Sequence, residues 1–162
     1  MQKLNARDIY VLVIIALLTV VLSVMLTLEL VSEYSSLRTV EDDSISINRK
    51  DLINNINTFF QIVLGIAAFI SILRVRRTGW IIALPLLTLF TTVSGILLFS
   101  ALGAGLLDVA VLIGGIIWLF FFVSIIFLLL PGTLRKFNVG KRAVIPAIIL
   151  FVFLVSVYFI VR

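Results

Sequence analysis

The sequence predicts an all-α fold, a polytopic transmembrane helix bundle, from three observations. First, 62% of the 162 residues are apolar and 13% are charged, whereas soluble domains are about half apolar and about a quarter charged. Second, the mean hydropathy is +1.30, so a soluble globule built from this chain would expose hydrocarbon. Third, the chain contains apolar runs whose length is close to that of a helix crossing a bilayer, which is about 20 residues. The five predicted spans cover residues 9–28, 56–73, 80–102, 107–130 and 143–161.

The one sizeable hydrophilic segment, residues 29–55, separates the first two spans. Within it, an acidic cluster at 41–43 precedes residues 44–47, where Ser and Ile alternate as they would in a short extended piece. Asn48, followed three residues later by a carboxylate, is typical of a helix start. We therefore expect a loop whose last residues already belong to a second helix that begins near Arg49.

The third and fourth spans are separated by a predicted turn. Residues 78–132 contain no Lys or Arg and one carboxylate, Asp108. As a single helix this stretch would be about 80 Å long at 1.5 Å per residue, far more than one crossing requires. The chain must therefore fold back within this stretch, and we expect the turn at Gly103-Ala104-Gly105. The fourth span ends at Pro131-Gly132, because neither residue readily continues a helix.

Basic residues are distributed unevenly over the two sides that this topology defines. Nine fall on one side: Lys3, Arg7, Arg74, Arg76, Arg77, Arg135, Lys136, Lys141 and Arg142. Four fall on the other: Arg38, Arg49, Lys50 and Arg162. The positive-inside rule then predicts a cytoplasmic N-terminus and an external C-terminus. We expect residues 1–162 to form a single membrane domain in the plasma (inner) membrane, with residues 29–55 as an extracytoplasmic loop.

The composition excludes several kinds of chemistry. The chain has no Cys and no His, so it offers no thiolate or imidazole metal ligand and no Ser-His or Cys-His nucleophile pair. No cofactor and no metal site is expected. The net charge of +5 reports topology rather than a nucleic-acid partner. Anionic lipid headgroups are expected at two basic clusters, which comprise Arg74, Arg76, Arg77, Arg135, Lys136, Lys141 and Arg142.

Polar and ionisable residues near the outer ends of the spans suggest a mouth that opens outward. The candidate residues are Glu29, Asn54, Asn57, Gln61 and Asp108. If they face the bundle, their carboxylates would attract cations. Two other interpretations remain open: a solvated rim, and a capping role for Asp108 at the start of the fourth helix.

Small and polar residues form a possible seam between the third and fourth spans, at similar depths counted from the predicted turn. The seam consists of Thr88, Thr92, Gly95, Ala110, Gly114 and Trp118. It could line a solute path, or it could be a helix-packing surface, because small side chains let helices approach closely. The indole N–H of Trp118 needs an acceptor from a neighbouring helix, or else the ring stacks on a ligand.

These features favour a non-catalytic multi-pass membrane protein that is a subunit or accessory protein of a membrane assembly, with a membrane-protein partner or a second copy. The alternative is a small transporter or channel that uses the outward mouth and the Thr/Gly seam. Ionisable groups deep in the membrane, which ion paths normally require, are absent from the sequence of the spans. An enzyme is not expected, because the acids have no companion base.

Overall fold

The structure is a computed structural model, and it describes residues 4–39, 49–105 and 108–161. These segments fold into helices and contain no strand. Five of the helices are long and apolar enough to cross a membrane, which confirms the predicted fold class of an all-α bundle. The helices are α1 (Ala6–Thr39), α2 (Arg49–Leu73), α3 (Arg77–Gly103), α4 (Val109–Leu129), α5 (Pro131–Lys136) and α6 (Lys141–Val161).

Two helix boundaries follow the sequence closely. The second helix begins at Arg49, as its start signal predicts. The chain also folds back after α3, where Gly105 adopts a φ of 74°. This left-handed conformation favours glycine, because the residue has no Cβ. The predicted turn between the third and fourth spans is therefore confirmed.

The predicted loop at 29–55 is wrong in its first part. The helix α1 continues through 34 residues to Thr39, or about 51 Å at 1.5 Å per residue, and so exceeds a hydrocarbon core of about 30 Å. The reason is local: residues 29–39 contain no Pro or Gly to end the helix. The acidic cluster at 41–43 and the expected extended piece at 44–47 lie outside the described residues.

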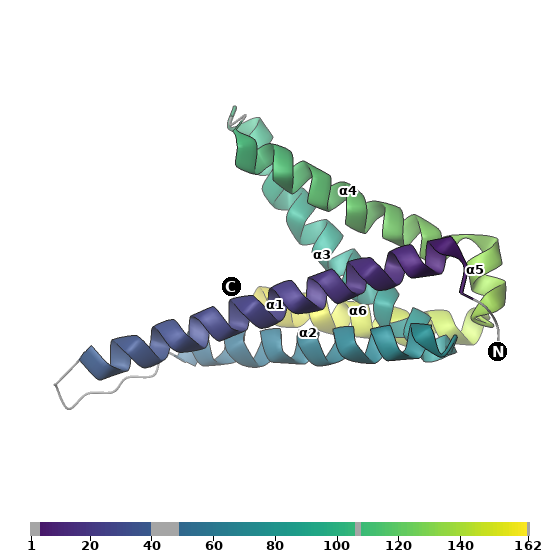
Figure 1. The fold of residues 1–162 in the computed structure, drawn as a ribbon, viewed down its shortest axis with the longest axis horizontal. Helices are drawn as coiled ribbons and strands as arrows, with labels where there is room; N and C mark the ends of the chain where they lie inside the picture. The colour runs from purple at the N-terminus through teal and green to yellow at the C-terminus, as the bar shows by residue number, and fades with distance from the viewer. Residues whose placement is uncertain (1–3, 40–48, 106–107, 162) are drawn as a thin grey trace.

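The helices run back and forth (Figure 1). α1 packs on α2, and α3 packs on α2, α4 and α6, while the outer part of the α3–α4 hairpin diverges from α1 and α2 (Figure 1). The basic end is defined here as the end that carries the start of α1, the α2–α3 connection, α5 and the start of α6. Its described basic side chains are Arg7, Arg74, Arg76, Arg77, Arg135, Lys136 and Arg142. The opposite end of the α1–α2 pair is called the outer end, and the side of the membrane that each end faces stays a prediction.

The core is concentrated toward the basic end. The larger cluster of buried residues includes Val11, Ile15, Ala68, Ile72, Trp80, Leu128 and Phe137. A smaller cluster follows α1 outward and contains Leu18, Leu22, Leu26, Ile62 and Leu86. Beyond these two clusters the diverging hairpin makes few buried contacts, since the buried residues of α4 are Ser124 and Leu128 in its last two turns.

Trp80 is a core residue, although it closely follows Arg74, Arg76 and Arg77 in the sequence and tryptophan is enriched at membrane interfaces. It is 2% exposed, and its indole Nε1 donates a hydrogen bond of 2.9 Å to the carbonyl oxygen of Leu128. That carbonyl lies in the last turn of α4, where helix carbonyls lack a partner within their own helix. The indole therefore ties the start of α3 to the end of α4. Pro131 then opens the short α5 from its first position.

Candidate functional site

The outer half of the α1–α2 pair carries most of the predicted mouth. The two helices come close at Gly65, where a Cβ would lie 2.3 Å from Oγ1 of Thr19. Because both helices rise about 1.5 Å per residue, Gln61 and Asn57 lie one and two turns farther toward the outer end. Asn54 follows them about one turn later and is half-buried. The α1–α2 pair thus has a polar interface at its outer end.

Asn57 and Gln61 form a buried amide pair. Both residues are buried, and Nε2 of Gln61 donates a hydrogen bond of 3.3 Å to Oδ1 of Asn57. They share a helix face with Gly65, since the three residues are spaced by four. Both residues belong to α2, and a side-chain hydrogen bond between residues four apart satisfies polar groups along one helix face.

Glu29 lies at the outer end of α1 and carries an unsatisfied atom. It follows Leu22 and Leu26 by seven and three residues, so it continues the helix face that forms the smaller core cluster. Its Oε2 is buried and has no hydrogen-bond partner among the described residues. A buried carboxylate oxygen without a partner can accept a hydrogen bond from a ligand or attract a cation, because leaving it unpaired is costly.

Asp108 is not brought together with the other four mouth residues. It caps α4, and its Oδ1 accepts a hydrogen bond of 2.9 Å from the backbone N–H of Val111. The start of α4 forms the tip of the diverging hairpin, well apart from the outer end of α1 and α2 (Figure 1). Sequence spacing did not show this separation, because it places the residues only by depth and says nothing of the direction in which a helix leans.

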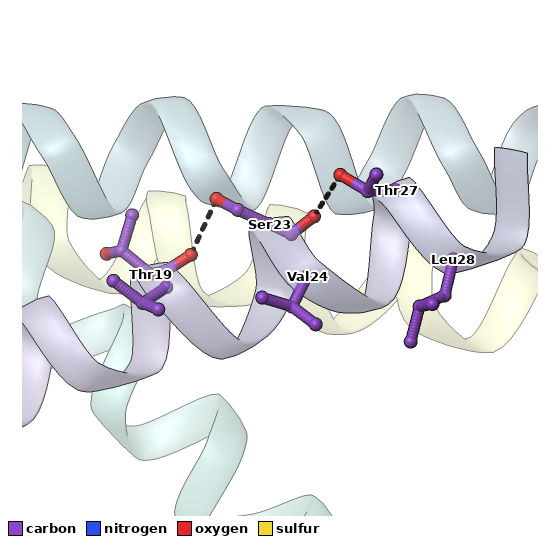
Figure 2. A pocket seen from close by; sticks show the side chains of 6 residues that line it. Thr19, Ser23, Val24, Thr27 and Leu28 are labelled. Atoms are coloured by element: carbon purple, nitrogen blue, oxygen red, sulfur yellow. Dashed lines mark hydrogen bonds between the residues drawn. The ribbon is translucent and has the colours of Figure 1, made fainter. Parts of the chain in front are cut away.

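A hollow of about 330 Å³ follows the outer part of α1 (Figure 2). Three hydroxyl residues spaced by four lie along it, and each hydroxyl donates to the carbonyl four residues earlier at 2.7 to 2.8 Å. These hydroxyls are therefore already hydrogen-bonded, and the surface of the hollow consists mainly of small side chains and hydrocarbon. The four-residue spacing of these hydroxyl residues is visible in the sequence, but it was not included among the predicted site residues. The lining residues are Thr19, Val20, Ser23, Val24, Thr27 and Leu28.

Within the possible seam, Gly95 and Trp118 meet. A Cβ on Gly95 would lie 2.8 Å from Nε1 of Trp118, so the glycine makes room for the indole. The ring stacks on Phe122, with centroids 5.3 Å apart and planes at 12°, and meets the edge of Phe99 at 6.0 Å. No described atom accepts a hydrogen bond from the indole N–H, and the expected Thr or carbonyl partner is not found in these segments.

The other seam residues are not gathered around that contact. Thr88 and Thr92 donate to carbonyls of their own helix at 2.7 and 2.8 Å. A Cβ on Gly114 would meet no described atom within 4 Å, whereas one on Gly115 would approach a leucine of α3 at 3.8 Å. Ala110 is exposed. Gly114 and Ala110 instead line a hollow of about 350 Å³ between α3 and α4, so at this depth the two helices do not touch through the small residues.

A buried ion pair at the basic end joins residues far apart in the sequence. The ammonium of Lys136 in α5 donates to the Asp8 carboxylate near the start of α1, and the side chains are 12% and 4% exposed. The same carboxylate accepts a hydrogen bond of 2.9 Å from the backbone N–H of Asn5, which is the geometry of a capping box. The sequence predicted Lys136 to be one of the headgroup-binding cations and did not indicate this pair, because nothing local links positions 128 residues apart.

The described residues contain no group of three or more Asp, Glu, His or Cys side chains placed to hold a metal ion. The chain is an integral multi-pass membrane protein by the length and apolar character of its five spans. Comparison with protein families, curated proteins and solved structures finds no match to this chain.

Proposed function

We propose that this protein is a non-catalytic subunit or interaction protein of a membrane assembly, whose partner is another membrane protein or a second copy of the chain. The observation that carries the proposal is the diverging α3–α4 hairpin (Figure 1). In α4 the buried residues are confined to Ser124 and Leu128, and in α3 the last buried residue is Gly95. The outer part of this hairpin therefore packs mainly against itself.

Helix packing in a bilayer supports an interaction role. Association of transmembrane helices depends on close van der Waals contact, because lipid tails are as apolar as leucine. A hairpin that leaves its own bundle forgoes such contact unless another helix supplies it. The hollow on α1 adds a second suitable surface, since its small residues would let a partner's backbone approach. We also propose that the protein lies in the plasma membrane with its N-terminus in the cytoplasm. The support is the basic end, because basic residues gather on the cytoplasmic side of membrane proteins.

The test is native mass spectrometry of the tagged chain after gentle solubilisation of membranes. We expect one assembly of defined mass and stoichiometry. A Gly114→Leu variant is expected to weaken it, because a Cβ here meets no described atom within 4 Å and Gly114 lines a hollow of about 350 Å³ between α3 and α4, so the added side chain would fill space that a partner's side chain can enter. Gly103→Leu, at an equally open position at the end of α3, is the matched control. A monomer in every preparation would contradict the proposal.

The alternative function is a small transporter or channel, and one observation favours it. The buried Oε2 of Glu29 has no partner among the described residues, and the buried pair of Asn57 and Gln61 lies at the same end of the same two helices. Together they would form a polar entrance attractive to cations. The described spans show no ionisable side chain at mid-membrane depth to continue such a path, so we place this function second.

Ion flux in reconstituted vesicles tests the alternative. With dyes for protons and potassium, a transporter is expected to give protein-dependent flux that Glu29→Gln and Gln61→Leu each reduce at least about tenfold, the scale of about 1.4 kcal/mol in a barrier. Asp108→Asn is the matched control, since Asp108 caps α4 at the separate hairpin tip. Wild-type vesicles without flux of either ion would remove this function from consideration.

A further inference from the structure

An apolar crevice of about 180 Å³ lies between α3 and α6, beginning one turn from the basic end. Along α3 it extends from Trp80 to Thr88, which is about 12 Å at 1.5 Å per residue. Val144 and Ile148 on its α6 side are exposed, so the crevice is open to the surrounding lipid. Its walls include Leu84, Pro85, Thr88, Val144, Ile148 and Phe151.

The polar groups in the crevice wall are already occupied. The Trp80 indole, which also lines the crevice, donates to the carbonyl of Leu128 at 2.9 Å. The Thr88 hydroxyl donates to the carbonyl of Leu84 at 2.7 Å. The wall therefore presents hydrocarbon to an occupant, and the chemistry that fits it is an acyl chain rather than a polar solute.

A basic residue, Arg77, lies one helical turn before Trp80, the first residue of α3 that lines the crevice. Arg77 opens α3, and it shares a helix face with Leu84 and Thr88, which follow seven and eleven residues later. Its Nε is buried without a hydrogen-bond partner among the described residues. The start of α6 lies at the same end (Figure 1), and helix N-termini carry partial positive charge. Asp8, the carboxylate at this end, is held by Lys136.

We propose that this crevice binds one anionic glycerophospholipid, with an acyl chain between α3 and α6 and with its phosphate accepting hydrogen bonds from Arg77. Charge complementarity between Arg77 and the phosphate favours this occupant. A guanidinium matches phosphate oxygens in a bidentate geometry, and no described carboxylate forms a salt bridge with Arg77. The proposal does not depend on whether the protein is a subunit or a transporter, since the crevice lies at the opposite end from the polar entrance.

Fluorescence quenching of Trp80 tests the site directly. A Trp118→Phe variant leaves Trp80 as the single tryptophan, and it is reconstituted in phosphatidylcholine vesicles with a small fraction of brominated phosphatidylglycerol. We expect quenching that saturates at low mole fraction, and weaker quenching by brominated phosphatidylcholine at the same fraction. Adding Arg77→Gln is expected to raise the mole fraction for half quenching about fivefold, the effect of one arginine on an anionic headgroup.

Matched variants separate the crevice from the surrounding lipid shell. Ile148→Phe fills the crevice and should abolish the saturable quenching, whereas Ile149→Phe should leave it unchanged, because Ile149 does not line the crevice. These side chains are 56% and 63% exposed, so neither change disturbs the core. Arg135→Gln, at an exposed position of α5, should also have no effect. Equal quenching by both brominated lipids, no quenching by either, or no response to Arg77→Gln would overturn the proposal.

Discussion

Replacing Lys136 with methionine is expected to destabilise the protein by about 3 kcal/mol, the scale found when one partner of a buried ion pair is removed. The Asp8 carboxylate is 4% exposed in its side chain and would keep the Asn5 N–H as its described donor. Methionine retains the length and apolar stem of lysine, so the change removes the charge more than the packing. Thermal unfolding in detergent, followed by circular dichroism, measures the loss.

The double variant Asp8→Asn with Lys136→Met separates the ion pair from general disruption. Without either charge, no unpaired ion is buried, and we expect at least about half of the lost stability to return. Arg7→Gln is the control, since Arg7 neighbours Asp8 but is exposed. A double variant that is less stable than Lys136→Met alone would show that the pair is not the source of the effect.

Replacing Gly79 with alanine is expected to cost about 3 kcal/mol, at the upper end of typical overpacking effects. An alanine Cβ would lie 2.7 Å from the backbone nitrogen of Ile72 and 2.8 Å from the backbone carbon of Ser71. Backbone atoms in the last turns of α2 cannot move aside as a flexible side chain would. The tight α2–α3 connection, in which Val75 has a φ of 49°, would have to open.

Gly114→Ala is the matched control for Gly79→Ala. Its added methyl meets no described atom within 4 Å, and alanine favours a helix by up to about 1 kcal/mol over glycine. We therefore expect unchanged or slightly higher stability in the same unfolding measurement. If Gly79→Ala unfolds at the wild-type temperature, the close approach of α2 and α3 at this position is wrong.

The spans were predictable because the bilayer imposes a simple condition on each one separately. Within hydrocarbon, backbone groups must be satisfied inside each helix, so length and apolar composition define a span. Both the Gly103–Gly105 turn and the start at Arg49 were readable from local residues. The extension of α1 to Thr39 was not expected, because hydrophobicity marks where a helix leaves the membrane and not where it ends.

The candidate site was much less predictable than the spans. Polar residues were visible in the sequence, but their partners were not: Gln61 pairs with Asn57 within one helix, whereas Asp8 pairs with Lys136 across the chain. Asp108 caps α4, on a hairpin that leans away from α1 (Figure 1). Which side chains meet depends on the tilt and rotation of each helix, and neither is written in the spacing of residues.

The sequence by itself determined that this chain is a membrane protein of five helical spans, and it determined where the chain turns and where its cations gather. Only the tertiary structure decided the divergence of α3 and α4, the burial of Trp80 and Asp8, and the crevice between α3 and α6. The reason is that transfer into lipid is a property of each segment alone, whereas packing between segments is not driven by hydrophobicity when the solvent is itself hydrocarbon.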